Sequence, residues 1–306
     1  MNARRVSVLM GGPSAEREVS LVSGAACAKA IRALGHSVSE IDIGFDLGRV
    51  VTELTEAKPD IAFNALHGRF GEDGCIQGVL ELMRIPYTHS GVRASALAMD
   101  KPTARRLFAE AGLACAEGRV CSRDEATGQH VMAPPYVIKP INEGSSVGVR
   151  IVFEGDPPPA DADWSFGDEV LIERYIPGRE IQVAVMGDRA LGAIEIRPKG
   201  RFYDFAAKYT DGQAEHLMPA PIAPPAYDEA LRIGTSAHEA LGCRGVSRTD
   251  LRFDDTGDGP GKFYLLEVNT QPGMTPLSLV PEIAAHAGID FGALVSWMLE
   301  DASCPR

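Results

Sequence analysis

The chain has 306 residues, more than the roughly 100–200 of one typical domain, so we expect two or three packed units. Its 45% hydrophobic and 24% charged residues are typical of a globular protein and exclude a disordered or fibrous chain. With 30 basic and 42 acidic residues the formal net charge is −12, which disfavours nucleic acid and anionic membranes as partners.

The apolar stretches of the chain are short. Residues 6–10 form the first one, shorter than the ~7–15 residues of a secretion-signal core. No stretch reaches the ~18 residues that a membrane span needs. The six cysteines include no C-x-x-C pair and no histidines at zinc spacing, so we expect reduced thiols. These features predict a cytoplasmic protein.

The first part of the chain alternates between strand and helix patterns. We expect strands at 6–10, 38–43 and 61–66, a helix that Ser14 caps and that ends near Gly35, and a helix at 77–83. Alternation at this spacing is typical of a parallel sheet with helices on its faces. Residues 1–96 are therefore expected to form an N-terminal α/β unit.

From residue 97 onward the pattern becomes rich in short strands. A helix at 101–111 precedes expected strands at 135–139, 149–153, 170–175, 181–185, 190–196, 246–253 and 263–268, with further helices at 227–241 and 291–299. The Pro-rich segment 154–163 is expected to be an exposed connection. Pro177-Gly178 indicates a hinge, so we expect two α+β units, 97–178 and 179–306.

A loop of small residues at 142–149 lies between two expected strands. Such residues let backbone N–H groups approach an anion closely, but a simple hairpin turn explains the loop about equally well. The loop is no P-loop, because it contains no G-x-x-x-x-G-K-[ST] and opens no helix. Lys139 ends the apolar strand before it, so it should point inward and need an anionic partner.

Two carboxylates lie in apolar strands near the end of the chain. Asp250 lies in the strand at 246–253, and alternation along the strand at 263–268 puts Glu267 and Asn269 on one face. Apolar flanks favour a buried oxygen cluster over a solvated surface, and Mg²⁺ prefers such oxygen ligands. We therefore predict a metal site at these residues.

The turn after the first expected strand contains Gly11, Gly12 and Glu16. Open α/β sheets bind ligands at this edge, but the turn lacks the G-x-G-x-x-G of dinucleotide sites. Glu16 suits a substrate ammonium group, although a first-turn carboxylate at a helix N-terminus is an equally good interpretation. His67, in the loop 66–74, is either part of a second rim or an ordinary turn residue.

Six motifs, spread in order over nearly the whole chain, resemble those of the D-alanine–D-alanine ligases of the ATP-grasp superfamily. They are G-G-P-S-A-E-R-E-V-S at 11–20, A-L-H-G-R-F-G-E-D-G at 65–74, M-D-K at 99–101, E-G-S-S-V-G at 143–148, F-Y-D and A-K-Y within 202–209, and E-V-N-T-Q-P-G-M-T at 267–275. The resemblance implies an ATP-grasp fold behind an N-terminal parallel α/β unit. It also implies a homodimeric enzyme that joins two D-alanines with ATP for peptidoglycan synthesis.

The resemblance also implies a role for each residue that matches a family motif. The nucleotide would contact Lys101 and Lys139 at its phosphates, Glu173, Arg174 and Phe202 at its base, and Glu180 at its ribose, with Gly144, Ser146 and Lys208 on closing loops. Two Mg²⁺ or Mn²⁺ ions would bind Asp250, Glu267 and Asn269. The two D-alanines would contact Glu16, His67, Arg248, Gly273, Ser278 and Leu279, with Ser145 and Tyr209 linking Glu16 to the mobile loop.

Two positions depart from the family pattern. Arg174 stands where a Lys is common and offers a planar fork in place of a point charge, and Pro157–Pro159 replaces a longer helix. Three alternatives remain: a ligase that forms D-alanyl-D-lactate, which a His in place of Tyr209 would favour; an NAD-dependent oxidoreductase; and a nucleotide-binding protein without activity.

Overall fold

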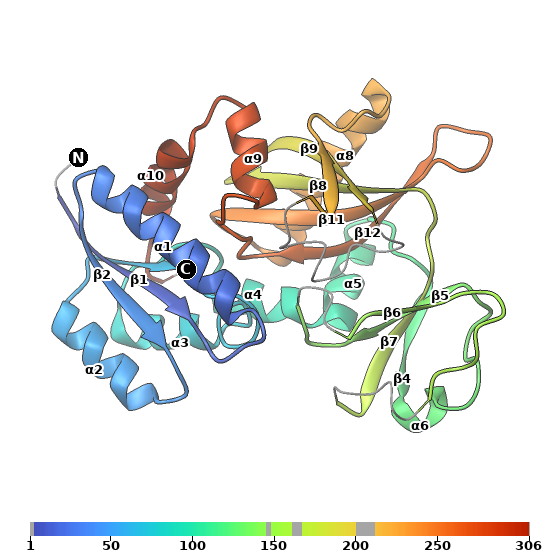
Figure 1. Cartoon of the computed structure of the whole chain (residues 1–306), viewed down its shortest axis with the longest axis horizontal. Coiled ribbons are helices and arrows are strands. Elements are labelled where there is room, and N and C mark those ends of the chain that lie inside the picture. Colours follow the sequence, from blue (N-terminus) through green and yellow to red (C-terminus); the bar gives the residue numbers. More distant parts are fainter. Residues whose placement is uncertain (1–2, 145–147, 161–166, 200–211, 306) are drawn as a thin grey trace.

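The computed structural model describes residues 3–144, 148–160, 167–199 and 212–305 of the chain. Three sheets follow one another along the sequence, and helices cover them (Figure 1). Each expected unit contains one sheet.

The first sheet is parallel, with strand order β2-β1-β3. Its strands and their helices are β1 Arg5–Gly11, α1 Arg17–Ala33, β2 Ser37–Ile43, α2 Leu47–Ala57, β3 Ile61–Asn64 and α3 Cys75–Met83. All but the first residue of β1 are buried, because helices lie on both faces of a parallel sheet. The expected parallel α/β unit is confirmed, but the expected cap is wrong: α1 begins after Glu16, and the Ser14 hydroxyl donates to the carbonyl of His67 at 2.7 Å.

The second sheet is antiparallel, with strand order β4-β7-β5-β6. It follows helices α4 Val92–Met99 and α5 Lys101–Glu110 and comprises β4 Gly118–Ser122, β5 Tyr136–Pro140, β6 Arg150–Val152 and β7 Glu169–Arg174, with the short helix α6 Arg123–Ala126. β5 and β6 pair around the small-residue loop, so the expected strand–loop–strand arrangement is confirmed.

The third sheet is also antiparallel, with strand order β10-β9-β8-β11-β12. Its elements are β8 Arg179–Met186, β9 Arg189–Pro198, β10 Ala214–Leu217, α8 Pro224–Leu241, β11 Val246–Asp254, β12 Lys262–Asn269, α9 Leu279–His286 and α10 Phe291–Asp301. Helix α8 packs on one face and α9 on the other, so the middle strand β8 is almost entirely buried.

The last helix returns to the first unit. α10 packs beside α1, and one apolar core contains Val8 and Ile31 from the N-terminal unit together with Ile283 and Leu294 from the C-terminal helices (Figure 1). The predicted boundary after residue 96 lies inside α4, whereas the one after 178 lies between β7 and β8. By length and composition, no single helix in the described ranges qualifies as a membrane span; α9 and α10 do so only together, with a 105° bend between them.

Candidate active site

The polar residues of the third sheet lie in rows across its strands. Asp250 on β11 stands directly between Gln182 on β8 and Glu267 on β12. In the next row, Arg248 pairs with Asn269. The predicted placement of Asp250 beside Glu267 on a neighbouring strand is therefore confirmed, and Asn269 lies one row further along β12.

Each carboxylate of this row has a cationic partner. Arg248 donates to both oxygens of Asp250, at 2.7 and 3.0 Å, and Lys101 Nζ lies 4.0 Å from Glu267 Oε2. Among the described residues, the buried Oε1 of Gln182 has no hydrogen-bond partner. A buried acceptor without a donor costs about 1–3 kcal/mol, which favours a ligand or water at this end of the row.

One cavity lies between the second and third sheets, and residues of both sheets form its wall. The structure brings seven predicted residues to its wall: Lys101, Lys139, Glu173, Arg174, Glu180, Asp250 and Glu267. This cavity is called the nucleotide cavity below, after the role that the sequence resemblance implies for these residues.

The buried carboxylate of Glu173 forms ion pairs with Lys139 and Arg105, and Glu173 and Lys139 line the nucleotide cavity. Lys139 Nζ lies 2.5 Å from Glu173 Oε2, so the prediction of an inward lysine with an anionic partner is confirmed. The other oxygen of Glu173 accepts a hydrogen bond from Arg105. Arg105 lies one helical turn after Lys101 on α5, so both side chains leave the same face of the helix.

Two further basic side chains lie over aromatic rings at this cavity. The Arg174 guanidinium lies 5.7 Å from the centre of the Tyr264 ring and donates to its hydroxyl at 3.3 Å. Arg252 lies 5.8 Å from the centre of the Tyr175 ring and 3.9 Å from Glu180. Arg174 thus uses the flat face that a lysine lacks.

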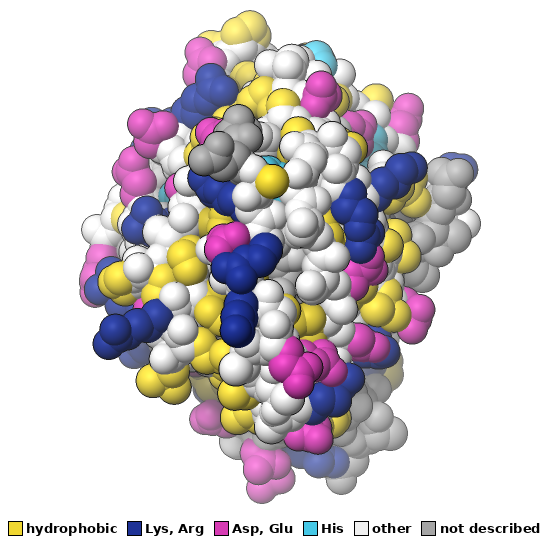
Figure 2. All heavy atoms as spheres, turned by 90° about the vertical axis from the view of Figure 1, so that its left-hand side faces the viewer, with side chains coloured by type: hydrophobic (Ala, Val, Ile, Leu, Met, Phe, Trp, Pro, Cys, Tyr) yellow, Lys and Arg dark blue, Asp and Glu magenta, His cyan; other side chains and the backbone are white. Residues whose placement is uncertain are grey.

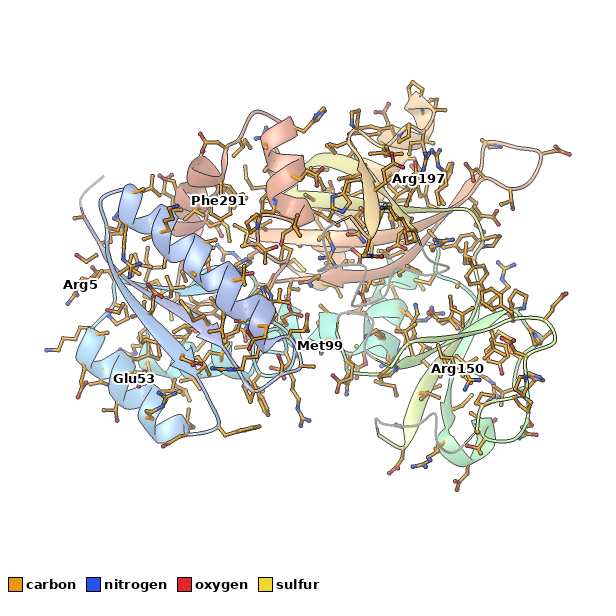
Figure 3. The ribbon with its side chains drawn as sticks, in the orientation of Figure 1. Arg5, Glu53, Met99, Arg150, Arg197 and Phe291 are labelled. Atoms are coloured by element: carbon orange, nitrogen blue, oxygen red, sulfur yellow. The ribbon has the colours of Figure 1, made fainter. Side chains whose placement is uncertain are left out.

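A second cavity adjoins the first and is called the substrate cavity below. Its wall contains all six residues predicted to bind the D-alanines: Glu16, His67, Arg248, Gly273, Ser278 and Leu279. Lys101, Glu143 and Glu267 line both cavities. Met99, labelled in Figure 3 between the N-terminal unit and the second sheet, also lines the substrate cavity.

Three glycines allow close approaches around the substrate cavity. A Cβ on Gly68 would lie 2.6 Å from Glu16 Oε2, and one on Gly144 would lie 3.0 Å from it. A Cβ on Gly273 would lie 2.7 Å from Ser278 Oγ. The Gly144 backbone therefore brings the hairpin loop next to Glu16.

Lys101 stands where the two cavities meet. Its ammonium group donates to the carbonyl oxygen of Glu143 at 2.5 Å. Burial lowers the pKa of Lys101 below its ordinary value, and the negative charge of Glu267 offsets part of this effect. An anion bound at this junction would favour the charged form of Lys101.

Some of the predicted residues lie outside the described part of the chain, and some residues of the site were not predicted. Ser145, Ser146, Phe202, Lys208 and Tyr209 lie outside the described residues. The sequence interpretation missed Arg105, Gln182, Glu72 and Gln271. Arg105 could have been predicted because it lies four residues after Lys101, on the same face of an expected helix. Gln182 could have been predicted because it lies two residues after Glu180, on the same face of an expected strand. His67 has side-chain partners in Ser23, at 3.0 Å, and Glu72, at 3.4 Å.

Comparisons with known proteins agree with this arrangement. The family described as "D-ala D-ala ligase C-terminus" matches residues 107–300, and "D-ala D-ala ligase N-terminus" matches residues 45–90. A D-alanine–D-alanine ligase from Parvibaculum lavamentivorans is 59% identical over 99% of both chains.

Two solved structures have the same fold over nearly the whole chain. The D-alanine–D-alanine ligase of Bacillus anthracis complexed with ATP has a TM-score of 0.80 and 28% identity, covering 98% of this chain and 97% of its own. The VanG D-Ala:D-Ser ligase of Enterococcus faecalis has a TM-score of 0.80 and 27% identity, covering 98% and 99%. The expected ATP-grasp fold is confirmed, and the chain belongs to the D-alanine–D-alanine ligase family.

Proposed function

We propose that this chain joins two D-alanines into D-alanyl-D-alanine for peptidoglycan synthesis, with cleavage of ATP to ADP and phosphate. The observation that carries the proposal is the junction of the two cavities at Lys101, Glu143 and Glu267. A phosphate chain in one cavity and a carboxylate in the other would meet beside the same lysine. That geometry suits phosphoryl transfer to a carboxylate.

The nucleotide cavity has the groups that a nucleotide needs. Lys101 and Lys139 would contact the phosphates, Glu173 the adenine amino group and Glu180 the ribose hydroxyls. Arg174 would lie beside the base, held by Tyr264. The hairpin loop with Gly144 and Ser146 would close over the phosphates, and Phe202 and Lys208 would complete the site.

The residues present fit two Mg²⁺ or Mn²⁺ ions at Asp250, Glu267 and Asn269. The described wall of the nucleotide cavity has five carboxylates against four basic side chains, so a polyphosphate needs added positive charge to enter. Within the described ranges no three His, Cys, Asp or Glu side chains form a metal cluster, and the proposed set has two carboxylates and one amide. Hard oxygen donors of this kind suit Mg²⁺. When bound, the ions neutralise charge on the phosphates.

The reaction would proceed in two steps. The first D-alanine would bind with its ammonium group at Glu16 and its carboxylate near Lys101, where it would take the γ-phosphoryl group to form an acyl phosphate. The amine of the second D-alanine would then attack the acyl carbon, and phosphate would leave as the peptide bond forms. Closed loops would exclude water, which otherwise hydrolyses the acyl phosphate.

Arg248 and Gly273 would stabilise the oxyanion of the tetrahedral intermediate. Asp250 holds the Arg248 guanidinium through two hydrogen bonds, so its orientation is fixed before substrate binds. One preorganised donor of this kind is worth about 3–4 kcal/mol. Ser278, with Leu279 beside it, would orient the carboxylate of the second D-alanine, and Ser145 and Tyr209 would connect Glu16 to the mobile loop.

We also propose a cytoplasmic homodimer. All six cysteines are free thiols, as in a reducing compartment. On the N-terminal unit, Phe45 is 82% exposed and Leu82 is 89% exposed, which supports a covered apolar surface in a dimer. Figure 2 shows this side of the molecule, where apolar side chains lie among basic and acidic ones. Light scattering at micromolar concentration tests the proposed dimer, and a mass equal to that of one chain would contradict it.

Phosphate release from Mg·ATP in the presence of D-alanine, L-alanine or D-lactate plus D-alanine tests the proposed function. We expect release with D-alanine alone and none with L-alanine. A product ester with D-lactate would favour the D-alanyl-D-lactate alternative. Absence of release with D-alanine, in a protein that still binds ATP, would favour the inactive nucleotide-binding alternative.

A further inference from the structure

The turn after β12 contacts the N-terminal unit through one buried side chain. Gln271 is 1% exposed, and the sequence separates it from its partners by more than 200 residues. Its Oε1 accepts from Asn64 Nδ2 at 2.6 Å, and its Nε2 donates to the carbonyl oxygen of Leu66. Both polar atoms of the side chain are therefore used to join two units of the fold.

Each end of this link leads to residues of the substrate cavity. On one side, the backbone N–H of Gln271 donates to Asn269 Oδ1 at 2.7 Å, and Gly273 follows two residues later. On the other side, Asn64 Oδ1 accepts from the N–H of Leu66 at 3.2 Å, directly before His67. The side chain of Gln271 therefore joins the turn that contains Asn269 and Gly273 to the loop that contains His67.

The loop 66–74, which contains His67, is in turn held next to Glu16. The Gly68 backbone approaches Glu16 closely, since a Cβ there would lie 2.6 Å from its carboxylate. Asn64 Nδ2 also donates to the carbonyl of Gly71 at 3.1 Å, which holds the rest of the loop. Ser23, which contacts His67, accepts from the N–H of Met274 at 3.2 Å and adds a second, weaker link.

We propose that Gln271 is a positioning residue for the first D-alanine. It sets the spacing between Glu16, which would hold the ammonium group, and Gly273, which would face the oxyanion. This inference rests on the proposed function, which places the ammonium group of the substrate at Glu16 and the oxyanion at Gly273. Reacting groups need placement to within about 0.5 Å, and a 1 Å error from a distant substitution costs up to ~100-fold in rate.

Three single variants and one double variant test the proposal. Gln271→Met keeps the volume of the side chain but removes both hydrogen bonds, and Asn64→Ala breaks the same link from the other unit. Gln77→Ala is the matched control, because Gln77 is also 1% exposed and donates to the carbonyl of Gly71 at 2.8 Å without reaching the C-terminal turn. Kinetics are measured at a temperature where each variant is folded by circular dichroism.

We expect kcat/KM for the first D-alanine to fall at least 10-fold in Gln271→Met and Asn64→Ala, while KM for ATP changes less than 2-fold. The loss in the double variant should be smaller than the product of the two single losses, because both substitutions break the hydrogen bond between Asn64 and Gln271. Gln77→Ala should stay within 2-fold of the unsubstituted protein. If Gln271→Met does not fold, the kcat/KM of Asn64→Ala for the first D-alanine tests the proposal.

Two results would overturn the proposal. In the first, the Gln271 and Asn64 variants melt at lower temperature but keep the D-alanine constants of Gln77→Ala, as a purely structural link predicts. In the second, the losses multiply in the double variant. Failure of the proposed function is distinct from both, since then the unsubstituted protein itself releases no phosphate with D-alanine.

Discussion

Replacing Glu173 with Gln is expected to destabilise the fold strongly, because it leaves two largely buried cations without their shared counter-charge. Glu173 is 2% exposed, and the side chains of Arg105 and Lys139 are 15% and 14% exposed. Gln keeps the shape of the side chain, so the change tests charge and not packing.

The size of the effect follows from this geometry. Two cations that contact one carboxylate lie about 5 Å apart, and at an effective dielectric constant of about 20 they repel by about 3 kcal/mol. Removing one partner of a buried ion pair typically costs about 3–5 kcal/mol. We therefore expect the free energy of unfolding to fall by about 3–5 kcal/mol.

Urea denaturation of the nucleotide-free protein measures this change, with Lys139→Met as the matched variant. Lys139→Met leaves the pair of Arg105 and Glu173 intact and should cost less. Adding it to Glu173→Gln removes one of the two repelling cations, so the double variant should recover at least about 1 kcal/mol. A stability within about 0.5 kcal/mol of the original for Glu173→Gln, or a further loss in the double variant, would refute the reasoning.

Three more predictions concern the metal, the base and pH. Glu267→Gln should abolish ATP-dependent turnover and weaken Mn²⁺ binding at least 10-fold in the presence of ADP; normal Mn²⁺ affinity by electron paramagnetic resonance contradicts the metal assignment. Arg174→Ala should raise KM for ATP several-fold with little change in KM for D-alanine, whereas equal changes in both would remove Arg174 from the base site. Burial lowers the pKa of His238 to about 4 from about 6.5. As the pH falls, the unfolded chain therefore binds the proton before the folded chain does. The contribution of His238 to the free energy of unfolding is complete above pH 6.5 and is lost as the pH drops toward 4. Between pH 7 and 5 the original should lose about 2 kcal/mol more than His238→Gln in urea titrations, and an equal loss in both contradicts this.

The elements with strong apolar patterns were predictable from the sequence. The expected strands at 181–185, 246–253 and 263–268 correspond to β8, β11 and β12, because their alternating or continuous apolar residues fill the core. Alternation also placed Glu267 and Asn269 on one face. Asp250 pairs with Glu267 because β11 and β12 are consecutive antiparallel strands joined by the short segment 255–261.

Four of the elements that the sequence interpretation missed, namely α2, α4, β4 and β10, bury little apolar surface. α2 buries only Val50 and Leu54, and α4 buries only Ala94, Ser95 and Ala98. β4 buries only Cys121, and β10 is four residues long with none fully buried. Such segments are fixed by contacts with the rest of the fold, so their own pattern carries little signal.

The pairing of charges and amides across the site was beyond the reach of local patterns. The sequence indicated that Lys139 needs an anion, but it did not indicate which one; the structure shows that Glu173 is the partner of both Lys139 and Arg105. Gln271 and Asn64 lie 207 residues apart. Periodicity describes one element at a time, and contacts of this separation depend on how the elements pack.

The transfer of oxygen from D-alanine to phosphate tests the central claim most directly, namely that the paired cavities bring a carboxylate to the phosphate chain of ATP. The enzyme would be supplied with D-alanine carrying ¹⁸O in its carboxylate, and the released phosphate analysed by mass spectrometry. Our account predicts one ¹⁸O in each phosphate released, because the acyl phosphate forms through a carboxylate oxygen and breaks at the acyl carbon. Phosphate without ¹⁸O, formed together with D-alanyl-D-alanine, would contradict it.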